Sequence, residues 1–177
     1  MSVERLPPQN VEAEQAVLGS LLIDREAIVR VASFLRAEDF YRESHAQIYQ
    51  AIVDLFERRE PADFVTLCDT LERRNLLDAV GGPAYITSLI NAVPTSIHVE
   101  HYGRIVELAA LRRRLIDVAG QIARLAYEEE RDLEEVIDRA EALLFEVTER
   151  RQSRDLVRLR QLLNEYYDRI EYLQQHR

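Results

Sequence analysis

Residues 7–22 read PPQNVEAEQAVLGSLL, and this stretch predicts a capped helix at the start of a helical protein. Pro7 and Pro8 hold the chain extended before the helix begins. Asn10 is a good N-cap, because its side-chain oxygen can accept a free N–H group of the first turn. Glu12 and Glu14 would place negative charge at the positive end of the helix dipole. One face then carries apolar side chains and a glycine that lets a neighbour approach closely, namely Val17, Leu18, Gly19, Leu21 and Leu22.

Helical periodicity continues to about residue 96, and no alternating strand pattern interrupts it. Asp24 is placed to cap a second helix, and His45 suits a structural hydrogen bond near the start of a third. We expect the further helices of this region at 25–35, 43–59, 64–75 and 83–92. They predict one compact globule whose core includes Leu18, Leu21, Phe40, Ile52, Phe56, Leu67, Leu71 and Leu89.

Two longer helices follow the globule, at 97–127 and 133–150. The connection between them is short and charged, which predicts an antiparallel helical hairpin. The second helix carries one apolar seam, made of Leu133, Val136, Ile137, Ala140, Leu143, Leu144 and Val147.

The first hairpin helix has more apolar positions than one partner helix can cover. One stripe contains Ile105, Leu108, Ile116, Ala119, Ala123 and Ala126, and an adjoining flank contains Leu111, Val118 and Leu125 with Ile122 beside it. The surplus predicts contact with the globule, another subunit or another protein. Our candidate interface residues are Tyr85, Leu111, Val118, Ile122 and Leu125, and an internal core role for the same residues is equally compatible with the pattern.

The last segment repeats apolar residues with heptad spacing, at Leu156, Leu159, Leu163, Tyr166, Ile170 and Leu173. It follows a polar hinge at residues 150–154. Two interpretations stay open: the segment folds back onto the hairpin, or it docks on something outside this chain.

The chain contains no lysine, so all 23 of its basic residues are arginine. A P-loop nucleotide site needs a lysine in the pattern G-x-x-x-x-G-K-[ST], so this chain cannot carry one. No glycine-rich phosphate loop, nucleophile motif or paired-cysteine motif is present either. The spacing of His98 and His101 offers two metal ligands at most, and we expect neither a catalytic residue nor a metal or cofactor site here.

The formal net charge is −9, with −7 in residues 1–103 from 16 acidic residues and 9 arginines. This balance is unlike the basic face of a domain that grips duplex DNA, and it is compatible with protein partners. The single cysteine, Cys68, excludes an internal disulfide and is expected to be a buried small residue. Without a signal peptide or a membrane-length apolar run, we expect a soluble, cytoplasmic protein with no membrane partner.

An ordered set of short motifs resembles the opening of bacterial replicative DNA helicases, the DnaB family. The set begins with PPQNxEAEQAVLG at residues 7–19 and continues to residue 106. Its later members are Asp39-Phe40-Tyr41, His45 with Ile48-Tyr49, Asp63 with Thr66-Leu67, Gly81-Gly82 with Tyr85, Val93-Pro94-Thr95, and Tyr102 with Arg104-Ile105-Val106.

The resemblance implies the N-terminal domain of a hexameric helicase that unwinds duplex DNA in the 5′ to 3′ direction. It implies self-association as dimers and hexamers in a trimer of dimers, and it implies docking of the helicase-binding domain of primase and of a helicase loader. The residues from Leu156 to Leu173 would form a linker helix on the ATPase domain of the neighbouring subunit. ATP and Mg²⁺ would bind that absent motor domain, and DNA would be contacted through the full hexamer.

These observations predict an all-α protein with a compact multi-helix globule, a long antiparallel helical hairpin and a C-terminal linker helix. The expected domains are residues 1–96, 97–150 and 151–177. Two other functions compete with the collar of a helicase: a self-associating helical scaffold unrelated to replication, and a small metal-dependent hydrolase that uses His98 and His101.

Overall fold

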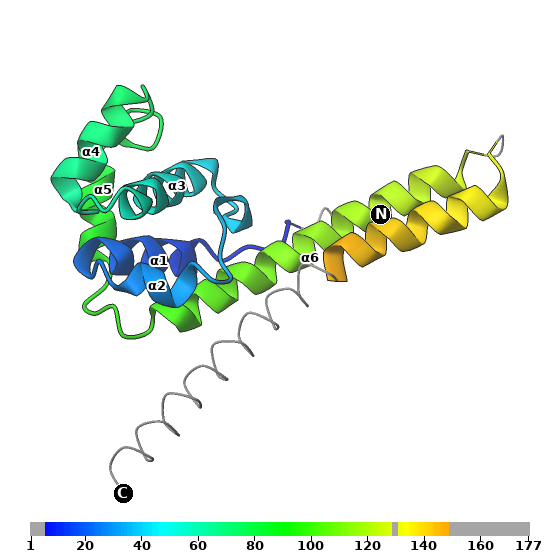
Figure 1. Cartoon of the computed structure of the whole chain (residues 1–177), viewed down its shortest axis with the longest axis horizontal. Coiled ribbons are helices and arrows are strands. Elements are labelled where there is room, and N and C mark those ends of the chain that lie inside the picture. The colour runs from blue at the N-terminus through cyan, green and yellow to red at the C-terminus, as the bar shows by residue number, and fades with distance from the viewer. Residues whose placement is uncertain (1–5, 129–130, 149–177) are drawn as a thin grey trace, which may run out of the picture. The chain divides into compact units, whose positions relative to one another are not determined.

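The computed structural model describes residues 6–128 and 131–148, and every regular element among them is a helix (Figure 1). The all-α prediction is therefore confirmed. The chain forms two compact units, residues 1–113 and residues 114–177. Within the described residues, no helix is both long enough and apolar enough to cross a membrane.

The first helix, α1, spans Val11–Ile23, as the opening stretch predicts. The backbone N–H of Ala13 donates to Oδ1 of Asn10 over 2.9 Å, which confirms the N-cap. Its apolar face is buried, and Gly19 lies directly against the fifth helix. A Cβ on Gly19 would stand 2.2 Å from the carbonyl oxygen of Leu89, so the two helix backbones approach too closely for a side chain.

The second helix is shorter than predicted, because α2 spans only Ala27–Val31. Phe34 and Leu35 are both buried although they are adjacent in sequence. Adjacent residues of a regular helix point in directions about 100° apart, so one buried face does not cover both equally. The chain instead leaves the helix before them and then turns through the 3₁₀ helix η1, Ala37–Asp39. Sequence patterns did not predict η1.

The turn before α2 is held by Asp24, whose Oδ1 accepts the backbone N–H of Glu26 over 3.0 Å. Its Oδ2 accepts the Ser96 hydroxyl over 2.6 Å and pairs with Arg30 over 3.0 Å. The Ser96 hydrogen bond is the main reason that the pKa of Asp24 lies below its usual value, and burial opposes it.

Three helices complete most of the first unit: α3 at Glu43–Glu57, α4 at Phe64–Arg73 and α5 at Gly82–Asn91. Asp63 caps α4 in a capping box with Thr66, and the backbone and hydroxyl hydrogen bonds from Thr66 lower the pKa of the Asp63 carboxyl. Contacts join α1 to α2, α3 and α5, and join α4 to α3 and α5.

Seven of the eight predicted core residues are buried, and Phe56 is the exception. The side chain of Phe56 is 44% exposed, so its assignment to the core is wrong. Phe56 lies in the last turn of α3, where its periodicity matches the buried face but no neighbouring element covers it. Cys68, expected to be buried, is half-buried, and burial raises the pKa of its thiol.

The longest helix, α6, spans Val99–Ala126, and its first half belongs to the first unit. Val99, Val106 and Ala110 are buried there, and a Cβ on Gly103 would meet the Phe34 ring at 3.1 Å. The Arg104 guanidinium lies over the same ring, 3.5 Å from its centroid. The globule thus includes a helical segment beyond residue 96, whereas the proposed domain boundaries remain predictions.

The second unit contains residues 114–126 of α6, a short turn and a further helical stretch at 133–148. Val118 on α6 and Leu143 and Val147 on the later stretch are each 7% exposed. Burial on both helices, joined by a turn of a few residues, agrees with the predicted antiparallel hairpin. Residues 149–150 of the second helix and the predicted linker helix lie outside the described residues.

Candidate functional site: a buried polar network and an exposed apolar face

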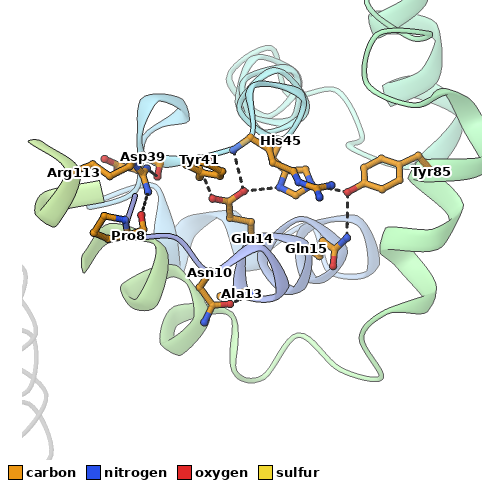
Figure 2. A network of polar contacts seen from close by, with 11 residues as sticks. Pro8, Asn10, Ala13, Glu14, Gln15, Asp39, Tyr41, His45, Tyr85 and Arg113 are labelled. Atoms are coloured by element: carbon orange, nitrogen blue, oxygen red, sulfur yellow. Dashed lines mark hydrogen bonds and ion pairs between the residues drawn. The ribbon is translucent and has the colours of Figure 1, made fainter. Parts of the chain in front are cut away.

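A buried carboxylate lies at the centre of the first unit. Glu14 on α1 is 1% exposed, and its Oε1 accepts the backbone N–H of Tyr41 over 2.6 Å. Its Oε2 lies 2.6 Å from Nδ1 of His45 and accepts a longer hydrogen bond, 3.4 Å, from the backbone N–H of Arg42. Figure 2 shows this carboxylate between the loop that precedes α3 and the ring of His45. Glu14 therefore joins α1 to α3, besides lying in the first turn where the helix dipole favours it.

The network continues from His45 to α5. His45 is completely buried, and its Nε2 lies 2.6 Å from the hydroxyl of Tyr85 (Figure 2). That hydroxyl also accepts the Nε2–H of Gln15 over 3.2 Å. All distances fit one proton arrangement, in which Nδ1–H donates to Glu14 and the Tyr85 hydroxyl donates to Nε2. The expected structural hydrogen-bonding role of His45 is confirmed.

A second polar anchor ties the long helix to the start of the chain. The guanidinium of Arg113 donates to the carbonyl of Pro8 over 2.8 Å and to the carbonyl of Asp39 over 2.6 Å. It also lies 5.6 Å from the centroid of the Tyr41 ring. The Asp39 side chain meanwhile accepts the backbone N–H of Arg36 over 2.8 Å. Several motif pieces that are far apart in sequence thus meet in one structural network.

Nothing in the described residues assembles a metal site from three or more ligands of the usual kinds. His98 and His101, the pair behind the hydrolase alternative, are both exposed and each contacts the ring of Tyr102 edge-on. Glu14 and His45, at the centre of the polar network, are buried, and among the described residues no buried side-chain nitrogen or oxygen lacks a hydrogen-bond partner. The geometry of the network therefore suits structural positioning.

The hairpin exposes a broad apolar surface in the second unit. Ile116 is 60% exposed on α6, and Leu133 and Ile137 are exposed on the following helix. On each helix the exposed apolar stripe is offset from the buried seam by a rotation of the same sense about the helix axis. Because the two helices run antiparallel, these two stripes lie on the same side of the hairpin. The resulting surface, called the hairpin face below, comprises Leu115, Ile116, Ala119, Ala123, Leu133, Ile137 and Leu144.

The predicted interface residues lie in several places. Tyr85 is half-buried in the globule, with its hydroxyl on His45. Val118 is buried by its own chain, whereas Leu111, Ile122 and Leu125 are half-buried. As interface residues they remain predictions. The linker seam at Leu156, Leu159, Leu163, Tyr166, Ile170 and Leu173 lies outside the described residues.

Both apolar stripes of α6 can be seen in the sequence, and the interface prediction uses the flank that contains Leu111, Val118 and Leu125. In the single chain that flank contains the buried position, and the wider stripe with Ile116 is exposed. Periodicity gives no sign of which stripe faces the partner helix. The regular spacing of Leu133, Ile137 and Leu144 on the second helix was the signal that could have identified the hairpin face.

A helical globule with a fully bonded polar interior, joined to a hairpin with an uncovered apolar face, defines the class of all-helical protein-interaction domains. A family model described as the DnaB-like helicase N terminal domain matches residues 6–107. The chain belongs to this family, which confirms the resemblance seen in its motifs.

Similar proteins agree with this assignment. The chain is 41% identical over 170 residues to the replicative DNA helicase DnaC of Bacillus subtilis and, over the same length, to the replicative DNA helicase DnaB of Geobacillus stearothermophilus. Each match covers 96% of this chain but only 37% of the relative. The chain thus spans little more than a third of these helicases.

Solved structures share the fold. The crystal structure of the N-terminal domain of DnaB helicase from Mycobacterium tuberculosis matches with a TM-score of 0.77 and 43% identity, covering 80% of this chain and 99% of that one. A structure of a DnaB-like replicative helicase, whose description includes its interactions with primase, matches with a TM-score of 0.66 and 28% identity. That match covers 78% of this chain and 31% of the helicase chain.

Proposed function

We propose that this chain acts as the assembly collar of a hexameric replicative DNA helicase that unwinds duplex DNA at the replication fork. The single observation that carries the proposal is the hairpin face, which exposes large apolar side chains such as Ile116 and Ile137 on a domain of this family. Continuous exposed apolar surface of this kind is typical of protein interfaces. A second hairpin from another subunit would cover it.

Partners of the collar follow from the same proposal. The description of one structural neighbour refers to primase, which supports docking of the helicase-binding domain of primase here. The further partners proposed for the collar are a helicase loader, the ATPase domain of the neighbouring subunit, and DNA held by the full hexamer. The motor chemistry, with ATP and Mg²⁺, would lie in a separate ATPase domain, because this chain has no lysine for a P-loop. Such a helicase works in the cytoplasm, at the nucleoid.

The collar would act by geometry. Hairpins that pair between subunits fix the spacing of the units that follow them in each chain. If residues 156–173 dock on the neighbouring motor, the arrangement of the collar and that of the motors are linked in one equilibrium. Primase or a loader that binds one collar arrangement more tightly would then shift the motor arrangement by its differential affinity.

The test is the mass of the protein in solution, by light scattering after size exclusion over a concentration series. We expect the wild-type chain to exceed its monomer mass of 20.6 kDa and Ile116→Asp or Ile137→Asp to reduce the mass to that of the monomer. A matched control is Val65→Asp, which changes an exposed apolar residue on α4. The helix content by circular dichroism should be unchanged in all three variants.

Two outcomes would count against the proposal. One is a wild-type monomer at every concentration that also fails to bind the helicase-binding domain of primase. The other is self-association that Val65→Asp weakens as much as Ile116→Asp does. Val118→Asp differs from these surface variants, because a charge at a buried position should unfold the hairpin and reduce helix content. The family match speaks against both a scaffold unrelated to replication and a metal-dependent hydrolase.

A further inference from the structure

A groove of about 530 Å³ opens on the surface of the first unit, between α2, the end of α3 and the loop that follows α3. Its apolar part is formed by Val29, Phe56 and Pro61, and charged residues including Glu26, Glu57 and Arg59 surround it. The volume lies in the range of sites that receive one or a few side chains of a ligand. The polar network and the hairpin face do not include any of these residues.

The apolar part of the groove is exposed without a covering element. Val29 is 63% exposed, although Ile28 and Val31 beside it are buried. Phe56 is exposed in the same groove, at a position where helical periodicity would otherwise predict the core. Large aromatic side chains in partly enclosed apolar sites contribute a large share of the binding energy at protein interfaces.

The walls of the groove are held in place by hydrogen bonds. Arg59 has a positive φ of 59°, which ends α3, and the backbone N–H of Glu60 donates to the carbonyl of Leu55 over 2.9 Å. The hydroxyl of Thr66 donates to the carbonyl of Pro61, which fixes the loop against α4. A groove that is already formed binds at a lower entropic cost than one that must order on binding.

The rim carries charges that the described residues do not neutralise. Glu26 and Glu57 make no side-chain hydrogen bond or ion pair with any residue that the structure describes, while Arg25 pairs with Asp63 and Glu60 pairs with Arg58. Among the described residues, Arg59 is the unpaired cation of the rim, and with Glu26 and Glu57 it leaves one excess negative charge. Residues 1–103 are also acidic as a whole, with 16 acidic residues against 9 arginines. The groove is therefore complementary to basic partners.

We propose that this groove binds a short segment of a partner protein that inserts a large apolar side chain between Val29 and Phe56 and places a basic side chain beside Glu57. The inference goes beyond the collar function and does not depend on it, because the groove contains no residue of the hairpin face. If the chain does not self-associate, the groove proposal is unaffected. If the groove binds no such segment, the collar proposal is unaffected.

The test uses the full chain and three synthetic peptides, with binding followed by isothermal titration calorimetry. The first peptide carries Leu and Phe one helical turn apart between arginines. The second replaces its arginines by glutamates, and the third replaces Leu and Phe by serines. We expect the first peptide to bind at least about tenfold more tightly than either of the others, since both the apolar anchor and the charge are needed.

Variants of the protein locate the binding site. Val29→Asp should weaken binding of the first peptide about tenfold or more, and Glu57→Arg should weaken it while strengthening binding of the glutamate peptide. Val65→Asp is the control, because Val65 is similarly exposed but lies outside the groove. The proposal is overturned if no peptide binds, if the two charge forms bind equally, or if Val65→Asp weakens binding as much as Val29→Asp. A wild-type chain whose self-association is abolished by Val29→Asp would also overturn it, since the occupant would then be a second copy.

Discussion

Glu14 is the residue whose environment most constrains the first unit. A buried carboxylate is tolerated only when hydrogen bonds replace its lost hydration. Here the replacements come from the backbone N–H groups of Tyr41 and Arg42 and from the ring of His45, so one side chain of α1 orders both the loop before α3 and the first turn of α3. Tyr49 is also buried in this unit; its hydroxyl donates to the carbonyl of Leu35, and burial raises the pKa of that hydroxyl.

Replacing Glu14 by Gln should lower the free energy of unfolding by about 2 kcal/mol, because charge-assisted hydrogen bonds become neutral ones and an amide N–H₂ faces a donor. Urea denaturation followed by circular dichroism measures the loss. Glu12→Gln is the control, since Glu12 is exposed in the same turn of the same helix and should change stability by less than about 0.5 kcal/mol. Equal effects of the two substitutions would show that the network does not stabilise the fold.

At the scale of elements, the crossing of α1 and α5 is set by the absence of a side chain. Gly19 brings the α1 backbone against the carbonyl of Leu89, and Cγ2 of Val93 would lie 2.6 Å from an added Cβ. The Leu89 carbonyl belongs to the backbone of α5 and cannot move aside cheaply, and the half-buried Val93 side chain follows just after the helix. The contact that joins these helices is therefore specific to glycine.

Gly19→Ala should lower the free energy of unfolding by about 3 kcal/mol, because the added methyl group forces the two helices apart. Gly120 gives the matched comparison, since an added Cβ there meets nothing within 4 Å and the residue lies inside α6. Gly120→Ala should increase the helicity and stability of the hairpin by up to about 1 kcal/mol through helix propensity alone. Thermal and urea unfolding of both variants would check the pair, and a destabilised Gly120→Ala protein would contradict the assignment of an open helix surface there.

At the scale of the whole molecule, the first half of α6 completes the core of the globule. Val99 and Val106 belong to that core, and Arg113 closes the first unit by donating to the carbonyls of Pro8 and Asp39, which lie far away in sequence. Burying the apolar side chains of this half of α6 contributes a substantial part of the net free energy of unfolding of a domain, which is itself small.

A chain shortened to residues 1–113 should therefore unfold cooperatively on heating, whereas one shortened to residues 1–96 should lose about 4 kcal/mol or more of stability. We expect the shorter chain to bind a hydrophobic dye and to show a broadened thermal transition. Differential scanning calorimetry with dye fluorescence tests the pair. Equal, sharp transitions of both chains would instead support the predicted boundary at residue 96.

Local chemistry in the sequence determined much of the secondary structure. Asn10 and Asp63 cap their helices through side-chain oxygens within a few residues, and the apolar face of α1 follows from its periodicity. These features depend on neighbours in sequence, so they can be predicted without knowing the fold. The short sequence motifs were also sufficient to predict the family. Glu14, Tyr41, His45 and Tyr85, which form one polar network in the structure, each lie in one of these motifs.

Tertiary structure alone decided what covers each apolar face. Phe56 has the periodicity of a core residue, yet no element reaches it, and Val118 rather than Ile116 faces the partner helix of the hairpin. The sequence predicts for Glu14 only the role of an acidic residue in the first turn of a helix. The fold places it beside His45, which lies 31 residues away in sequence. The physical reason is the same in each case: periodicity states that a face is apolar or a group is polar, but burial depends on surfaces supplied by segments far away in the chain.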